Sequence, residues 1–204
     1  MSGLQAVDAR AATRRAVTPN NTVLGIAATE IDIAGRLLYV VAIGKAAWTM
    51  AAGLTDGLGQ KIRRGIVCGP PYEGIQLPDW QTFVGGHPLP TEESIAAARA
   101  TLRLLKNTEE NSVVIFLISG GGSAMFELPV DNAITIENLR EANRLLTSCG
   151  ATIAEINAVR RAFSAVKGGK LPDTAGTSLL VPIGGGDAPC GLRPPRAHYE
   201  RRNS

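Results

Sequence analysis

The sequence predicts an α/β fold in which a parallel sheet is flanked by helices. Short apolar runs alternate along the 204-residue chain with segments whose apolar residues recur at helical spacing. The run at residues 113–118 has only apolar side chains, as is typical of a strand buried on both faces of a parallel sheet. Three glycines, residues 120–122, follow this run, and open α/β sheets bind ligands beyond the carboxyl ends of their strands.

Composition restricts the class of protein. Hydrophobic residues make up 45% of the chain, which supports one globular domain, alone or with a remnant of another. The net charge of +3 is spread along the chain, which argues against a nucleic-acid partner. No apolar run approaches the roughly 20 residues that span a bilayer, and the N-terminus lacks a signal-peptide core. We therefore expect a cytoplasmic protein without a membrane partner.

The cysteines and histidines do not suggest a metal site. Cys68, Cys149 and Cys190 are far apart, without a Cys-x-x-Cys pair, and the chain has only two histidines. These counts argue against structural zinc, and unpaired thiols fit a reducing cytoplasm. We predict no metal ligands.

The elements before residue 91 are predicted from apolar runs and from glycine and proline. A short helix is expected at residues 6–17, and an alanine-rich helix at residues 46–54. The expected strands are residues 37–43, 65–68 and 82–84. Gly-Pro-Pro closes the second strand, and the third runs into Gly-Gly-His-Pro-Leu-Pro.

The elements after residue 90 are predicted from caps and helical periodicity. Thr91 is expected to cap a helix whose apolar residues recur at helical spacing through Leu105, and a further helix is expected at residues 135–148. Thr152-x-x-Glu155 forms a capping-box pattern. The helix that it opens is expected to carry its apolar stripe to Val166 and to stop at Lys-Gly-Gly, residues 167–169.

Lys45 lies between a predicted strand and a predicted helix. A cation there opposes the helix dipole, so binding of a phosphate or carboxylate would explain it, although exposure to solvent would also remove most of the cost. The segment is not a P-loop, because Tyr39 occupies the first glycine position and Ala46 follows the lysine. Dinucleotide fingerprints fail at Met125 and Pro189, which counts against an NAD-linked oxidoreductase.

The Ser-Gly-Gly-Gly-Ser segment is the stronger candidate site. Bare backbone N–H groups of Gly120, Gly121 and Gly122 could hold an anion, whereas the alternative is a tight turn required by close packing. Ser119 and Ser123 bound the segment. A nucleophilic role for the second serine is disfavoured, because Gly-x-Ser-x-Gly is absent.

Two further groups of residues are weaker candidates. His87 stands in a loop that prolines and glycines make rigid, yet a single histidine is more often packed than catalytic. Basic side chains also crowd the predicted end of the last helix, where they either compensate the dipole or reach a ligand anion. These are Arg160, Arg161, Lys167 and Lys170.

Several ordered motifs together resemble the glycerate 2-kinase family, whose C-terminal domain is called MOFRL. The motifs are Val-Val-Ala-Ile-Gly-Lys-Ala (40–46), Gly-His-Pro-Leu-Pro (86–90), Leu-Ile-Ser-Gly-Gly-Gly-Ser-Ala (117–124), Ile-Ala-Glu-Ile-Asn-Ala-Val-Arg (153–160) and Lys-Gly-Gly-Lys-Leu (167–171). The resemblance covers about the first 171 residues.

The resemblance implies ATP-dependent phosphorylation of D-glycerate to 2-phosphoglycerate with Mg²⁺, in a cleft between a Rossmann-like N-terminal domain and the C-terminal domain. It implies that Lys45 is the active-site lysine and that residues 119–123 form the phosphate loop. His87, Asn157, Arg160 and Lys167 are implied as contacts to substrate or phosphate. Similar sequences also carry the older name hydroxypyruvate reductase, and a homo-oligomer is compatible with the resemblance.

The chain departs from the family pattern after Leu171. The family continues with Ser-Asp-Val-x-Gly-Asp-Asp, whereas this chain has Pro-Asp-Thr-Ala-Gly and a tail rich in proline and arginine. We expect a domain at residues 1–171 and a divergent, disordered tail at 172–204, with residues 179–183 as its one candidate strand. The MOFRL domain is expected to be absent, which leaves an incomplete kinase. The alternative is a non-catalytic, truncated isoform that binds nucleotide or a full-length partner.

Overall fold

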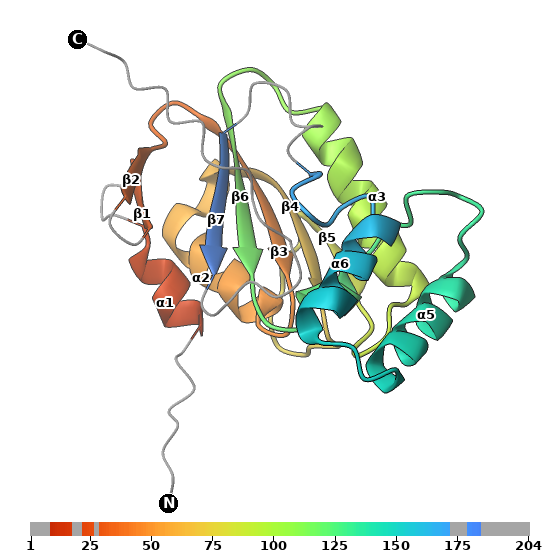
Figure 1. The fold of residues 1–204 in the computed structure, drawn as a ribbon. Helices are drawn as coiled ribbons and strands as arrows, with labels where there is room; N and C mark the ends of the chain where they lie inside the picture. The colour runs from red at the N-terminus through yellow and green to blue at the C-terminus, as the bar shows by residue number, and fades with distance from the viewer. Residues whose placement is uncertain (1–8, 18–21, 27–28, 172–178, 185–204) are drawn as a thin grey trace, which may run out of the picture.

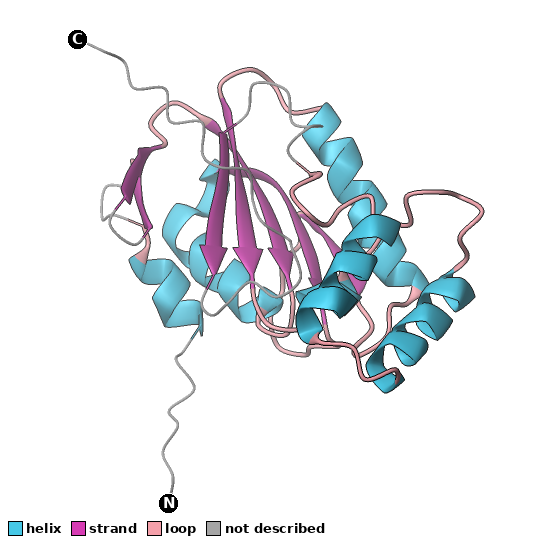
Figure 2. Cartoon of the chain, viewed as in Figure 1, coloured by secondary structure: helices cyan, strands magenta, loops and turns pink. Residues whose placement is uncertain are grey.

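A parallel sheet of five strands forms the centre of the molecule (Figures 1 and 2). The computed structural model describes residues 9–17, 22–26, 29–171 and 179–184. The strand order is β5-β4-β3-β6-β7, and every pairing in the sheet is parallel. The strands are β3 (Leu37–Ile43), β4 (Ile62–Gly69), β5 (Trp80–Val84), β6 (Ser112–Ile118) and β7 (Leu179–Gly184). The predicted α/β parallel fold is therefore confirmed.

Helices cover both faces of this sheet (Figure 1). Helices α1 (Ala9–Arg15) and α2 (Ala47–Leu58) lie on one face, and α3 (Glu92–Lys106) lies on the other. Helices α5 (Ile136–Ser148) and α6 (Ile153–Phe163) lie on the α3 side, toward the carboxyl ends of the strands. The remaining helical segments in the described ranges are η1 (Gly59–Lys61) and α4 (Gly122–Met125). Across the described ranges, no helix combines the length and the apolar character needed to cross a bilayer.

The two central strands are buried on both faces. On β6, Val114 and Phe116 pack with the α3 layer, while Ile115 and Leu117 pack with the α2 layer. All seven residues of β6 are buried, which confirms the prediction for residues 113–118. Because successive side chains of a strand point to opposite faces, an unbroken apolar run is what a three-layer arrangement requires.

Threonine residues cap the N-termini of three helices. The sequence predicts two of these caps. Thr91 and Thr152 accept hydrogen bonds from backbone N–H groups in the first turns of α3 and α6, and Thr135 does the same for α5. Each cap is a reciprocal box, with Ser94, Asn138 or Glu155 as the partner.

The predicted end of the last helix is wrong. Helix α6 ends at Phe163 and does not continue to Val166. Ser164 is extended and forms an isolated antiparallel bridge with Pro129. The Ala165 N–H donates to the Leu128 carbonyl at 2.8 Å, so a distant segment supplies the backbone partners that a further helical turn would have supplied.

Two strands outside the main sheet were not predicted. They are β1 (Val23–Ile26) and β2 (Thr29–Asp32), which pair antiparallel. In the segment assigned to the tail, β7 contains the candidate strand at residues 179–183 and pairs with β6. The predicted disorder of residues 172–178 and 185–204 lies outside the described residues.

Burial makes Cys68 the less reactive of the two described cysteines. Its side chain is fully buried on β4, and its Sγ donates to the Met125 carbonyl at 2.8 Å. Burial, with a smaller contribution from the Glu93 carboxylate, raises the pKa of this thiol to about 12. Cys149 is exposed.

We expect a Cys190→Ser variant, which leaves these two thiols, to show one fast reaction with a disulfide reagent at pH 8. The fast thiol is Cys149, and removing it with a further Cys149→Ser change should abolish the fast phase. Cys68 should react only after denaturation, because the folded protein holds almost no thiolate there. Rapid modification of two thiols in the folded protein, measured by absorbance, would contradict the burial of Cys68.

Candidate active site

The strand order creates a crevice between β3 and β6. From β3 the chain adds β4 and β5 on one side, and it then adds β6 and β7 on the other side. The connections after β3 and β6 therefore leave in opposite directions, and this topological switch point is where open α/β sheets bind ligands. Gly44 and Lys45 follow β3, and the Ser-Gly-Gly-Gly-Ser segment follows β6. Two predicted site segments thus meet at one edge of the sheet.

Ser119 joins the ends of the two strands. Its N–H donates to the Ile43 carbonyl at 2.9 Å, and its Oγ accepts the Ala46 N–H at 3.0 Å. The Lys45 N–H donates to the Gly120 carbonyl at 2.8 Å. Gly44, at φ +110°, packs so closely that a Cβ on it would lie 2.5 Å from the Ser119 carbonyl oxygen. Ser119 therefore has a connecting role, and this junction has no space for a side chain at residue 44.

Lys45 and His87 meet over Gly121. A Cβ built on Gly121 would lie 3.0 Å from His87 Cδ2 and 3.2 Å from Lys45 Cγ. Gly121 adopts φ +84° and caps α4. Within the described part of the chain, the N–H groups of Gly120 and Gly121 donate no hydrogen bond. A lysine side chain, an imidazole and two backbone donors therefore surround the same turn.

A pocket of about 250 Å³ opens beside this turn. One wall is the loop before α3 together with α4, and the opposite wall is formed by α5, α6 and the segment after α6. The polar and charged lining residues are His87, Ser123, Glu127, Asn143, Arg160 and Lys167. The pocket is therefore concave, contains two cations and one carboxylate besides His87, and lies at the carboxyl edge of the sheet.

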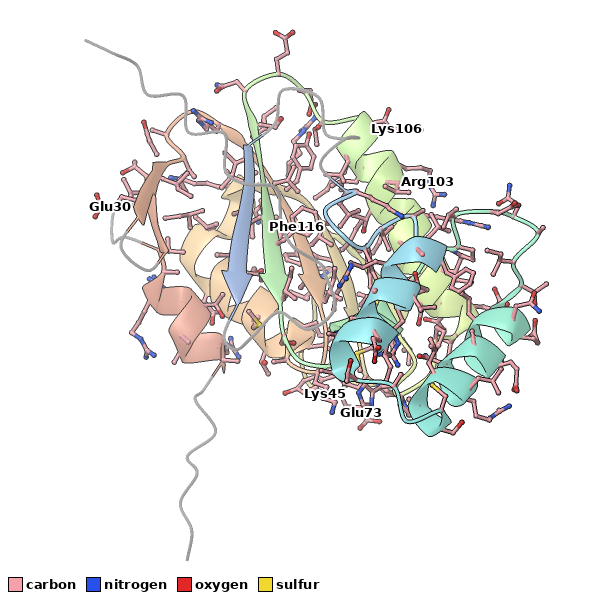
Figure 3. The ribbon with its side chains drawn as sticks, viewed as in Figure 1. Glu30, Lys45, Glu73, Arg103, Lys106 and Phe116 are labelled. Carbon is pink, nitrogen blue, oxygen red and sulfur yellow. The ribbon has the colours of Figure 1, made fainter. Side chains whose placement is uncertain are left out.

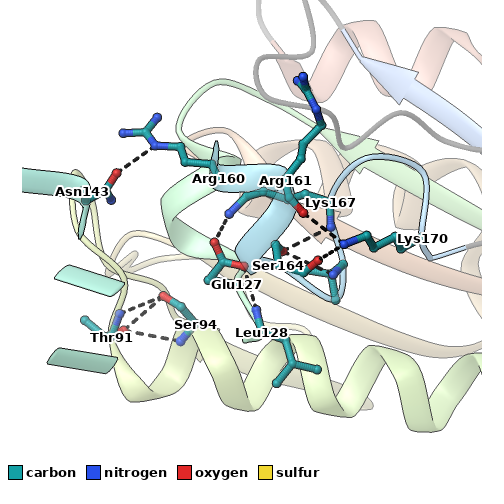
Figure 4. A network of polar contacts seen from close by, with 11 residues as sticks. Thr91, Ser94, Glu127, Leu128, Asn143, Arg160, Arg161, Ser164, Lys167 and Lys170 are labelled. Atoms are coloured by element: carbon teal, nitrogen blue, oxygen red, sulfur yellow. Dashed lines mark hydrogen bonds and ion pairs between the residues drawn. The ribbon is translucent and has the colours of Figure 1, made fainter. Parts of the chain in front are cut away.

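A buried ion pair joins the two walls (Figure 4). The Lys167 Nζ contacts the Glu127 carboxylate, and the two residues are 1% and 7% exposed. Nearby, the Arg160 Nε donates to the Asn143 side-chain oxygen at 2.8 Å. A buried ammonium is costly without a partner, so Glu127 accounts for the presence of a lysine at this depth.

The structure brings together most of the residues that the sequence singled out. Lys45, His87 and Gly121 are in contact range, and Ser123, Arg160 and Lys167 line the adjoining pocket. Gly120 is exposed beside the pocket and Gly122 is buried in α4. Asn157 is half-buried on α6 and does not line the pocket.

Sequence reasoning missed Glu127 and Asn143. Glu127 had a usable signal, because it stands in Met-Phe-Glu-Leu-Pro, where a carboxylate among apolar residues implies a buried partner. Asn143 had none, since an amide on a polar helix is ordinarily solvated. Over the ranges that the structure describes, no group of three or more His, Cys, Asp and Glu side chains could hold a metal ion.

Comparison with known proteins shows the family to which this chain belongs. Residues 1–183 match the family described as "Domain of unknown function (DUF4147)". The chain belongs to the DUF4147 family. This match extends beyond Leu171 and into β7, so the domain boundary at residue 171 stays a prediction.

The DUF4147 chain is similar to longer proteins named as kinases. It is 42% identical over 148 residues to D-glycerate 2-kinase of Thermotoga maritima, covering 72% of this chain and 35% of that protein. It is 40% identical over 181 residues to glycerate 2-kinase of Pyrococcus horikoshii, covering 88% and 40%. A crystal structure of a Pyrococcus horikoshii protein superposes with a TM-score of 0.78 at 37% identity, covering 88% and 40%. The chain thus spans about two fifths of the length of these relatives.

We expect Gly44→Ala to lower the free energy of unfolding by at least about 2 kcal/mol, because φ +110° strains an L-residue and the Cβ would collide with Ser119. Gly120→Ala is the matched control. Apart from its chain neighbours, no atom of the described residues lies within 4 Å of its added methyl, so stability should change by less than about 0.5 kcal/mol. Urea denaturation measures the free energy of unfolding of both variants. Equal stability of the two would contradict the close packing of Gly44 against Ser119.

We expect Glu127→Ala to destabilise the protein by about 3–5 kcal/mol, because it leaves the Lys167 ammonium buried without its carboxylate. The exposed Glu110→Ala should change stability by less than about 0.5 kcal/mol. A Glu127→Leu/Lys167→Met double variant should recover most of the loss, since it removes both charges. Thermal denaturation would contradict the pairing if the single and double variants lost equal stability.

Proposed function

We propose that this chain forms the phosphate-binding half of a glycerate 2-kinase. The reaction would transfer the terminal phosphoryl group of ATP to the 2-hydroxyl of D-glycerate. The observation that carries the proposal is the close approach of the Lys45 side chain to Gly121 at the switch point, where a Cβ on Gly121 would lie 3.2 Å from Lys45 Cγ. The names of two longer relatives, D-glycerate 2-kinase and glycerate 2-kinase, also support it.

Lys45 and the glycine turn would neutralise and orient the phosphates. Phosphoryl transfer requires mainly positioning and stabilisation of charge on the phosphoryl oxygens. Lys45 is exposed, so its ammonium can approach an oxygen from one side. The N–H groups of Gly120 and Gly121, which donate no hydrogen bond within the described residues, can donate from another. Successive backbone donors in a turn form an anion-binding concavity, and the Lys45 ammonium would add positive charge beside it.

The pocket beside the turn suits a small carboxylate. Arg160 uses its Nε to hold Asn143, which leaves the terminal amino groups of the guanidinium as donors. Hydrogen bonds between a guanidinium and a carboxylate are charge-assisted and geometrically specific. We assign the glycerate carboxylate to Arg160 and Lys167, with the hydroxyl groups directed toward the turn.

Mg²⁺ would reach the site on the nucleotide. The described residues offer no cluster of acidic, histidine or cysteine side chains that could form a protein cage. Mg²⁺ usually keeps several waters and binds through substrate phosphates with one or two carboxylates. This half of the site therefore supplies cations and backbone donors around a magnesium nucleotide.

The second candidate function is nucleotide binding without phosphorylation of glycerate. It is favoured by the switch point itself, where Lys45 and the glycine turn would hold phosphates whether or not glycerate is bound. A coupled assay with D-glycerate, ATP and Mg²⁺ separates the two functions, because only the kinase forms phosphoglycerate. Reduction of hydroxypyruvate is disfavoured, since no dinucleotide fingerprint is present.

We expect Lys45→Ala to weaken binding of magnesium ATP by roughly 10- to 150-fold, the range for losing a hydrogen bond to a charged group. Lys106→Ala is the control, because Lys106 lies at the opposite end of the sheet (Figure 3). It should bind as the wild type does. Isothermal titration calorimetry measures the affinity of the wild type and of both variants for magnesium ATP. Equal affinity of the two variants, or no binding by the wild type, would refute the assignment.

A further inference from the structure

An aromatic pair stands at the same edge of the sheet as the glycine turn. Tyr72, in the loop after β4, is 45% exposed. Its ring stacks on Trp48 with centroids 6.3 Å apart and an angle of 19° between the planes. Trp48 is 9% exposed, and its Nε1 donates to the Pro70 carbonyl at 3.0 Å. The indole is therefore a fixed support, and much of the tyrosine ring remains open to solvent.

The aromatic pair adjoins the junction that carries Lys45. Trp48 follows Lys45 by three residues, in the first turn of α2. A Cβ built on Gly69 would lie 3.0 Å from Trp48 Cδ1 and 3.1 Å from the Gly44 carbonyl oxygen. The loop after β4, the start of α2 and the end of β3 thus meet at one point. Figure 3 shows Lys45 and Glu73, the neighbour of Tyr72, at the same end of the sheet.

Tyr72 differs from the other exposed apolar side chains. Among large exposed hydrophobic residues in the described ranges, the aromatic ones are Tyr72 and Phe163. Phe163 lines the pocket that we assign to glycerate. Tyr72 does not line that pocket and is 45% exposed, so it is accounted for by neither the core nor the proposed substrate site.

We propose that the exposed face of Tyr72 is the platform on which the base of the nucleotide stacks, while its phosphates extend to Lys45 and the glycine turn. This proposal rests on the proposed function, because it takes the bound anion to be a nucleotide. Trp48 holds the platform in place by stacking beneath it. Stacking on an aromatic ring tolerates different bases, since every base has a π-face. The site should therefore discriminate weakly between ATP and GTP.

The test compares ATP with tripolyphosphate, which has the phosphates but no base. We expect Tyr72→Ala to weaken binding of magnesium ATP by about 5- to 150-fold, the range for losing one base–aromatic stack. Binding of magnesium tripolyphosphate should stay within about twofold of the wild type. Tyr72→Phe keeps the ring and should retain ATP affinity within about twofold. Calorimetry gives the affinities, and circular dichroism checks that the variants are folded.

Four outcomes would overturn the platform. If Tyr72→Ala binds ATP with wild-type affinity, the base does not stack on Tyr72, although the proposed function can still hold. Equal losses for ATP and tripolyphosphate would show that the loop supports the phosphates instead. Binding of tripolyphosphate but not ATP by the wild type would exclude a base site and retain the anion site. If the wild type binds neither ligand, both the platform and the proposed function fail.

Discussion

The hydrogen bonds between the carboxyl ends of β3 and β6 determine the position of every other part of the site. The Ile43 carbonyl accepts the Ser119 N–H, and the Ser119 hydroxyl in turn accepts the N–H of Ala46 at the start of α2. Both strands lie between two helical layers, so their register cannot slip by one residue without moving buried side chains to the wrong face. Lys45 and Gly121 come together because this register is fixed.

The two walls of the pocket differ in how firmly they are attached. The inner wall, formed by the loop before α3 and by α4, continues from the sheet. The central strands of the sheet are almost completely buried. The outer wall, formed by α5, α6 and the segment after α6, has helices with few buried residues. Helix α5 buries Ile136 and Leu139, and α6 buries Ile156. The bridge between Pro129 and Ser164 and the buried ion pair compensate for this sparse packing. Regions with few buried apolar contacts open at lower free energy than the core, so the outer wall is the part of the pocket best able to adjust around a ligand.

The fold has the strand order of a dinucleotide-binding protein, but its chemistry differs. The switch point is formed by a lysine and a short glycine turn, without the glycine spacing that admits a pyrophosphate to a long helix. Helix α4 has four residues, so its dipole is small, and in the proposed function Lys45 would add the charge that such a short helix lacks. Function here depends on the residues placed on the fold and not on the fold itself.

Much of the fold could be predicted from the sequence. Continuous apolar runs identified the buried strands because a strand between two layers has no solvent-facing side. The threonine caps of α3 and α6 were predictable because capping depends on residues only three positions apart. The same local reasoning identified Lys45 and the glycine turn as unusual, although it gave no distance between them. The antiparallel pair of β1 and β2 was missed because β2 has only one apolar residue among four and therefore forms no apolar run.

By itself, the sequence determined the layered α/β class, the central strands and the two segments that meet at the switch point. Only the tertiary structure decided that α6 ends at Phe163, that Lys167 is buried, and that Glu127 is its partner. These features depend on hydrogen bonds and ion pairs between segments separated by 35 to 40 residues. Local propensity cannot encode such contacts, because the free energy of a buried charge depends on which groups the rest of the chain places beside it.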